Sequence, residues 1–223
     1  MKKSIFAQTW RRYLLSQHTK AQVLLQLCGM FALIEAALWT TGPLRLLFIT
    51  VIAIGCLIVL GSQPSNRAGT DTCRPGAWNW TLKIAFTASM VILGVGLAAG
   101  WLHRPSGRWP VPIGIVLYLF WAVLQQFVLQ ALFFVRLQRL VGDGRFTMIV
   151  CALLFCVTHL PSIILVVTTF FAALFFCESF RRYRTIYPIA VAHSMLALAL
   201  SAAVPEGLLR QMRVGAAYLH YFH

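Results

Sequence analysis

Long apolar runs, separated by short polar stretches rich in glycine and proline, fill nearly the whole chain of 223 residues. Several runs reach the roughly 20 residues that an α-helix needs to cross a hydrocarbon core of about 30 Å. Gly42-Pro43, Pro161 and Pro188 fall between runs, where these residue types end or begin helices. The pattern predicts one all-α domain, residues 1–223, folded as a polytopic membrane bundle of about seven transmembrane spans. The expected spans are 22–41, 43–61, 80–101, 111–135, 147–160, 162–178 and 187–204.

The two ends of the chain and one junction depart from this regular pattern. Residues 1–20 mix Trp10, Arg11 and Arg12 with aliphatic side chains, which is typical of a helix lying in the membrane interface. The tail, residues 208–223, has the same mixture and the same expected place. The fifth and sixth expected spans are short and meet at His159-Leu160-Pro161, where we expect a tight turn buried by neighbouring helices.

Composition and charge exclude two broad classes of protein. Apolar residues make up 60% of the chain, charged residues 11%, and the mean hydropathy is +0.78, which no soluble globule can bury. The net charge of +14 does not indicate a nucleic-acid-binding protein, because no soluble basic face with interleaved aromatic residues is present. The six cysteines form no disulfide framework and no metal motif.

The distribution of the basic residues predicts the orientation in the membrane. If the expected spans alternate in direction, 14 of the 19 Lys and Arg residues fall on the side of the N-terminus. Cytoplasmic loops collect basic residues, so we expect a cytoplasmic N-terminus and attraction to anionic lipid on that side. We expect a multi-pass protein of the bacterial inner membrane.

Polar side chains at membrane depth are the candidates for function, because burying them without partners is costly. Gln126 and Gln130 lie four residues apart and share one helix face, as do Phe155 and His159. With His193 from a later span, they can line one interior cavity. The candidates are Glu35, Gln125, Gln126, Gln130, His159, Glu178 and His193, of which Glu178 is expected to form a salt bridge with Arg181 and Arg182.

The order and spacing of these residues resemble the CPBP intramembrane proteases, which include type II CAAX prenyl endopeptidases and bacteriocin self-immunity proteins. QQFVLQ, Gln125 to Gln130, stands where that family has Glu-Glu-x-x-x-Arg. FCVTH, Phe155 to His159, is similar to the second motif, and His193 in AHSMLA is similar to the third. The resemblance covers about residues 111–200 and implies that these side chains share an intramembrane site.

The departures from the family pattern predict impaired chemistry. The resemblance implies a first glutamate that activates water with His159, and a third-motif His and Asn that steady an oxyanion. A carboxylate can act as a general base, whereas the amide of Gln125 cannot. Gln126 removes the second carboxylate, Gln130 replaces the arginine, and Ala197 stands where the asparagine is expected. We therefore expect a CPBP fold without glutamate-driven peptidase activity.

Without cleavage, the site is expected to bind or scaffold a partner. The expected partners are a transmembrane or prenylated peptide, or another membrane protein, with Gln130 and Phe155 among the contacts. Paired amide hydrogen bonds from the glutamines suit a peptide backbone.

Three alternatives stay open at the level of sequence. In the first, the protein is an active protease in which Glu35 supplies the carboxylate and His159 and His193 are retained. In the second, the glutamines and histidines only join helices through hydrogen bonds. In the third, His159 and His193 ligate a haem or a chlorin, since imidazole is a common axial ligand; otherwise no cofactor is expected.

Overall fold

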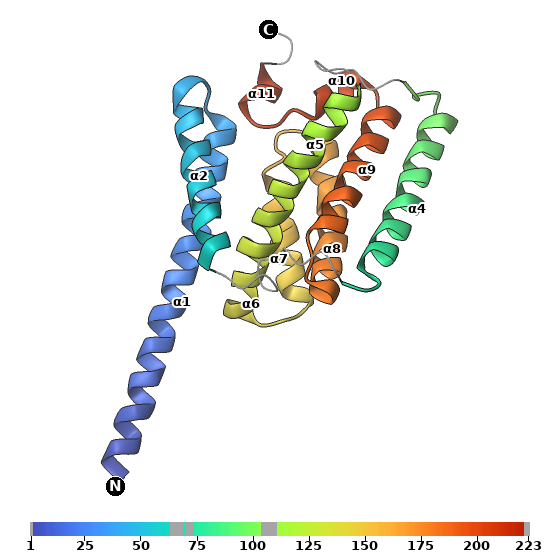
Figure 1. Cartoon of the computed structure of the whole chain (residues 1–223). Helices are drawn as coiled ribbons and strands as arrows, with labels where there is room; N and C mark the ends of the chain where they lie inside the picture. Colours follow the sequence, from blue (N-terminus) through green and yellow to red (C-terminus); the bar gives the residue numbers. More distant parts are fainter. Residues whose placement is uncertain (1, 63–68, 70–73, 104–110, 221–223) are drawn as a thin grey trace.

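The computed structural model describes residues 2–62, 69, 74–103 and 111–220, and every regular element in these ranges is helical (Figure 1). The elements are α1 (Lys2–Trp39), α2 (Gly42–Ser62), α4 (Ala77–Ala98), α5 (Val111–Gln126), the π-helix η1 (Phe127–Phe134), α6 (Val135–Val141), α7 (Arg145–Val157), α8 (Ile163–Tyr183), α9 (Tyr187–Ala203), α10 (Glu206–Leu209), the 3-10 helix η2 (Arg210–Met212) and α11 (Ala216–Leu219). The predicted all-α class is confirmed.

Four helical stretches are long and apolar enough to cross a membrane: Lys20–Trp39, Ala77–Ala98, Ile113–Val141 and Ile163–Tyr183. The apolar helices Gly42–Ile58, Arg145–Val157 and Tyr187–Ala203 are shorter. Helices therefore occupy all seven expected positions, but seven helices long enough to cross the membrane are not confirmed. One of the short helices, α7, is bounded by Gly142 and Gly144 before it and by the 158–162 turn after it.

Two helices differ from the boundaries predicted from the sequence. A separate interfacial helix at the N-terminus was a wrong expectation, because α1 runs unbroken from Lys2 to Trp39. Residues 2–28 contain no proline or glycine to interrupt the backbone hydrogen bonds. The span expected to end at residue 135 continues to Val141, and the first helix-breaking residue after it is Gly142, at φ 89°.

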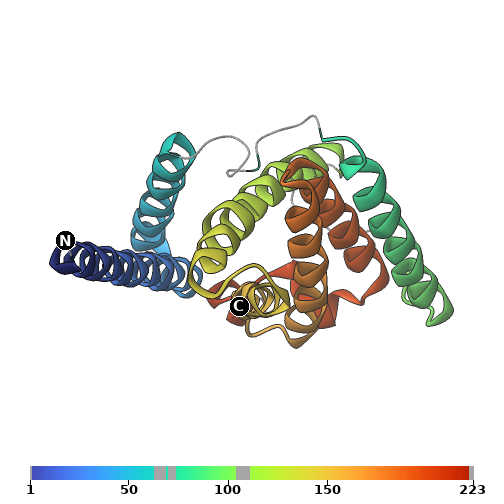
Figure 2. The ribbon, with the colours of Figure 1, turned by 90° about the horizontal axis from the view of Figure 1, so that it is seen from below.

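The helices behind the site pack around α9, which lies between α5 and α4 (Figure 1). At Gly96 in α4 a Cβ atom would lie 2.6 Å from the Cβ of Ala203 in α9, so the two backbones approach closely there. Seen from below, α1 and α2 form a hairpin beside this group (Figure 2). One cluster of buried apolar side chains nevertheless joins α1 and α2 to η1, α7 and α8.

The predicted turn between the fifth and sixth segments is present as residues 158–162. The backbone N–H of Leu160 donates to the carbonyl of Val157 at 3.0 Å, and Ser162 Oγ caps α8 by accepting from Leu165 N at 3.5 Å. Gly215 N of the C-terminal tail donates to Leu160 O at 2.8 Å. The tail, which was expected to be interfacial, therefore folds against this turn.

Candidate functional site

A cavity of about 630 Å³ lies among α1, α2, α4, α5, η1, α7, α8, α9 and the tail. This volume falls within the range of about 300–1,000 Å³ that is usual for ligand sites. Its wall is mostly aliphatic and aromatic, and hydrogen-bonding groups are few. Those on α5, α9 and the 158–162 turn are Tyr118, Trp121, Gln125, Thr158, His159 and His193.

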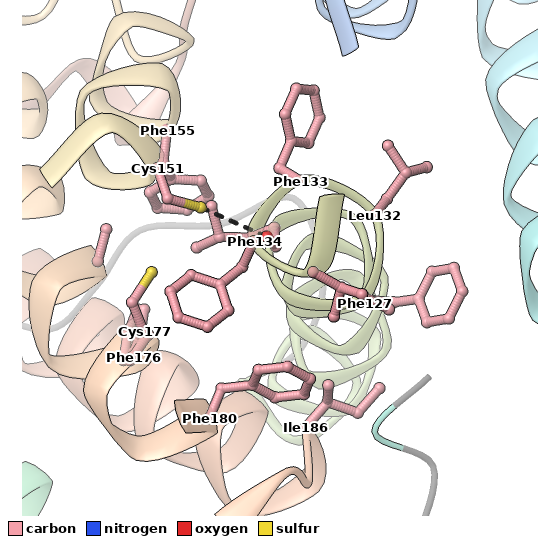
Figure 3. Packing of buried hydrophobic residues seen from close by; sticks show 14 of the residues in the cluster. Phe127, Leu132, Phe133, Phe134, Cys151, Phe155, Phe176, Cys177, Phe180 and Ile186 are labelled. Atoms are coloured by element: carbon pink, nitrogen blue, oxygen red, sulfur yellow. Dashed lines mark hydrogen bonds between the residues drawn. The ribbon is translucent and has the colours of Figure 1, made fainter. Parts of the chain in front are cut away.

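The helix that carries the glutamines changes its winding just after them. Gln125 and Gln126 end α5, and residues Phe127–Phe134 form the π-helix η1, in which Val135 N donates to Gln130 O five residues back. Cys151 Sγ of α7 also donates to the carbonyl of Leu129 at 3.5 Å (Figure 3). Short π segments inside α-helices are frequent at functional sites. The sequence prediction missed this segment, since no proline or glycine marks it.

Gln126 and Gln130 form a buried hydrogen-bonded chain that ends at His193. Gln130 Nε2 donates to Gln126 Oε1 at 3.3 Å, and Gln126 Nε2 lies 3.1 Å from His193 Nδ1. Both glutamines are 0% exposed. An amide nitrogen only donates, so in this arrangement His193 Nδ1 accepts and the ring proton of the neutral imidazole lies on Nε2. The far oxygen, Gln130 Oε1, is buried and has no partner.

His159 has the opposite arrangement of its ring proton. Its Nδ1 lies 2.8 Å from the carbonyl oxygen of Phe155, which only accepts, so Nδ1 carries the proton. The neutral ring then presents a lone pair at Nε2, whereas His193 presents an N–H. The Phe155 ring packs against both imidazoles, with centroid distances of 4.8 Å to His159 and 6.0 Å to His193. His159 therefore offers a hydrogen-bond acceptor and His193 offers a donor, and both rings contact Phe155.

The structure brings most, but not all, of the predicted site residues to the cavity wall. Gln125, Phe155, His159 and His193 line it. Gln126 and Gln130, the latter expected as a substrate contact, lie behind the wall with no exposed surface. Gln130 supports Gln126 instead, because both side chains are turned toward the packed interior.

The carboxylates of Glu35, the alternative catalytic residue, and of Glu178 lie outside the cavity wall. Glu35 accepts a hydrogen bond from Trp39 Nε1 at 3.1 Å on its own helix and is not among the lining residues. Glu178 pairs with Arg182 and, at 2.8 Å, with Arg181, which confirms the predicted salt bridge. In the described ranges, no acidic side chain lines the cavity.

Several residues of the wall were missed from the sequence. Tyr118 lies two helical turns before Gln125 on α5, and its ring centroid is 6.1 Å from that of His193 in an edge contact. That seven-residue spacing is the signal that could have found it. Met212 and Val214 of the tail also line the cavity. Ala197, at the position expected for an asparagine, contributes only a methyl group.

The fold and the site define an all-helical membrane protein with a largely apolar internal cavity and a cluster of neutral hydrogen-bonding groups. A family model described as type II CAAX prenyl endopeptidase Rce1-like matches residues 107–199. This match confirms, over that segment, the resemblance carried by the three motifs. No curated protein and no solved structure matches the chain.

Proposed function

We propose that this CAAX-protease-like membrane protein binds an apolar peptide segment, transmembrane or prenylated, in the cavity and does not cleave it through a glutamate. The observation that supports this proposal is the amide of Gln125 on the same wall as His159, with no described carboxylate beside them. A neutral amide has no usable basicity near neutral pH, so it cannot take the proton of an attacking water.

A site without a general base and without an oxyanion donor loses most of its rate of peptide cleavage. A general base typically contributes about 10²- to 10⁴-fold, and an oxyanion donor about 10²- to 10³-fold. Here the first position is an amide and the expected asparagine position is Ala197, a lining methyl group. Both contributions are absent together, so cleavage falls to the background rate.

The same groups are well suited to hold a peptide. Gln125 lines the cavity, and its buried Oε1 has no hydrogen-bond partner, so rotation of the side chain toward the cavity lets the amide accept a backbone N–H and donate to a carbonyl. His193 adds an Nε2–H donor in the tautomer set by Gln126. Each hydrogen bond contributes about 0.5–1.5 kcal/mol, which selects peptide over plain hydrocarbon.

The test compares the natural chain in detergent or nanodiscs with Gln125→Glu, Gln125→Glu/Gln126→Glu and a His159→Ala blank. One transmembrane peptide and one prenylated peptide serve as substrates. The natural chain should retain a peptide but cleave no faster than the blank, and Gln125→Ala should weaken retention about tenfold through the lost hydrogen bonds. Gln211→Ala, an exposed amide on the tail, is the matched control. Cleavage by the natural chain that disappears in His159→Ala would overturn the proposal.

We further propose that the chain is a multi-pass protein of a bacterial inner membrane with its N-terminus in the cytoplasm. The distribution of basic residues supports this orientation.

A further inference from the structure

Arg45 is the charged residue of the cavity wall. Of the described residues that line the cavity, it is the one that carries a formal charge. Its side chain is half-buried near the start of α2, and within the described part of the chain no hydrogen bond or ion pair engages it. A cation beside an apolar wall is less well solvated than one in open water, so an anion bound beside it is stabilised.

The acidic residues that the structure describes do not supply that counterion. The four described carboxylates all have hydrogen-bond partners outside the cavity wall. The pairs are Glu35 with Trp39 at 3.1 Å, Asp143 with Gln138 at 2.8 Å, Glu178 with Arg181 at 2.8 Å, and Glu206 with Gln211 at 2.8 Å. Among the residues that the structure describes, no anion therefore complements Arg45.

The surroundings of Arg45 indicate what kind of anion fits. Arg45 lies three residues after Gly42, where the chain turns from α1 into α2, and helix ends are the level at which lipid headgroups lie. The wall is otherwise largely aliphatic, and it includes Ile49 and Ile52 on α2 and Ile84 and Ala88 on α4. The site thus has a cationic mouth and an apolar body.

We propose that this cavity holds one acyl chain of an anionic phospholipid, with the phosphate of its headgroup on the guanidinium of Arg45. Moving an acyl chain from the bilayer into an apolar cavity changes its free energy little, because both surroundings are hydrocarbon. The headgroup therefore decides which lipid is retained. A guanidinium binds phosphate through two parallel hydrogen bonds and favours an anionic headgroup over a zwitterionic one.

The test uses the full chain in nanodiscs of phosphatidylcholine mixed with phosphatidylglycerol, followed by native mass spectrometry of the released protein. The natural chain should keep one phosphatidylglycerol, and Arg45→Gln should lose it about tenfold more readily. Arg213→Gln is the matched control, because Arg213 is exposed on the tail and does not line the cavity. Ala88→Phe fills the apolar body without touching the cation and should also release the lipid.

The outcomes separate this lipid site from a surface contact and from the proposed peptide binding. If Arg45→Gln retains phosphatidylglycerol as well as the natural chain does, Arg45 does not bind the headgroup. The same conclusion follows if the natural chain retains phosphatidylcholine as well as phosphatidylglycerol. Retention by Ala88→Phe would place the lipid on the outer surface and overturn the cavity site. A thermal melt of each variant in detergent confirms that it is folded. Peptide cleavage and retention are measured separately, so either proposal can fail alone.

Discussion

At the scale of single residues, the exchange of carboxylates for amides has different consequences at its two positions. Gln125 lies on the cavity wall and its buried oxygen has no partner, whereas Gln126 is fully buried and forms hydrogen bonds with His193 and Gln130. A carboxylate at position 126 would only accept hydrogen bonds, so the proton of His193 would lie on Nδ1. Nε2 would then be an acceptor and no longer a donor. The amide therefore fixes which atom of His193 can serve a ligand.

The buried position should matter more for stability than the cavity position. Gln126→Leu leaves His193 Nδ1 and Gln130 Nε2 without partners, so we expect a loss of about 1–3 kcal/mol in the free energy of unfolding. Gln125→Leu makes the same change of side chain where the oxygen is already unpartnered, and should cost clearly less. Unfolding in detergent micelles, followed by tryptophan fluorescence, measures both. Equal losses would mean that the Gln126 chain of hydrogen bonds contributes little.

At the scale of helices, the close approach of α4 and α9 supports the wall that carries His193. Gly96→Ala places a methyl group 2.6 Å from Ala203 Cβ and 2.8 Å from its Cα, so the helices must separate. We expect a destabilisation of about 1–3 kcal/mol, as is usual for overpacking. Gly94→Ala on the same helix meets nothing within 4 Å and is the matched control. Thermal unfolding of both variants in detergent tests this, and a melting temperature for Gly96→Ala equal to that of Gly94→Ala would contradict it.

The helices and much of the site were predictable because they depend on local signals. Apolar runs bounded by Pro161, Pro188 and Gly42 give the elements, and the spacing of Phe155 and His159 places both on one face. The π-helix was not predictable, since its five-residue hydrogen bonds depend on packing against α7, including the contact of Cys151 with Leu129. That long-range contact leaves no periodic trace in the sequence.

The place of the tail also depends on contacts distant in the chain. Gly215 has a φ of 56°, and any Cβ there would collide with the backbone of Leu38 at the end of α1. This close approach, with the hydrogen bond to Leu160, carries Met212 and Val214 onto the cavity wall. A pattern of apolar and basic residues predicts an interfacial segment but not the surface on which it rests.

At the scale of the whole molecule, the ends of the helices define two sides. The N-terminus and α6 lie toward one end of the bundle in Figure 1, and α10 and α11 lie toward the other. The loop after α6 carries Asp143 beside Gln138, among basic residues of the proposed cytoplasmic side, whereas Arg45 and the tail lie at the opposite end. The lipid site proposed at Arg45 therefore belongs to the outer leaflet if the N-terminus is cytoplasmic.

Labelling of single cysteines tests this orientation directly. In a background with all six native cysteines replaced by serine, Asp143→Cys and Gln211→Cys each place a thiol at an exposed position at opposite ends of the bundle. A membrane-impermeant maleimide should label position 211 in intact cells and position 143 only in inverted vesicles, because basic loops are retained in the cytoplasm. Ala199→Cys, buried in α9, should stay unlabelled in both preparations until the protein is denatured. Labelling of position 143 from outside intact cells would reverse the topology and move the Arg45 lipid to the inner leaflet.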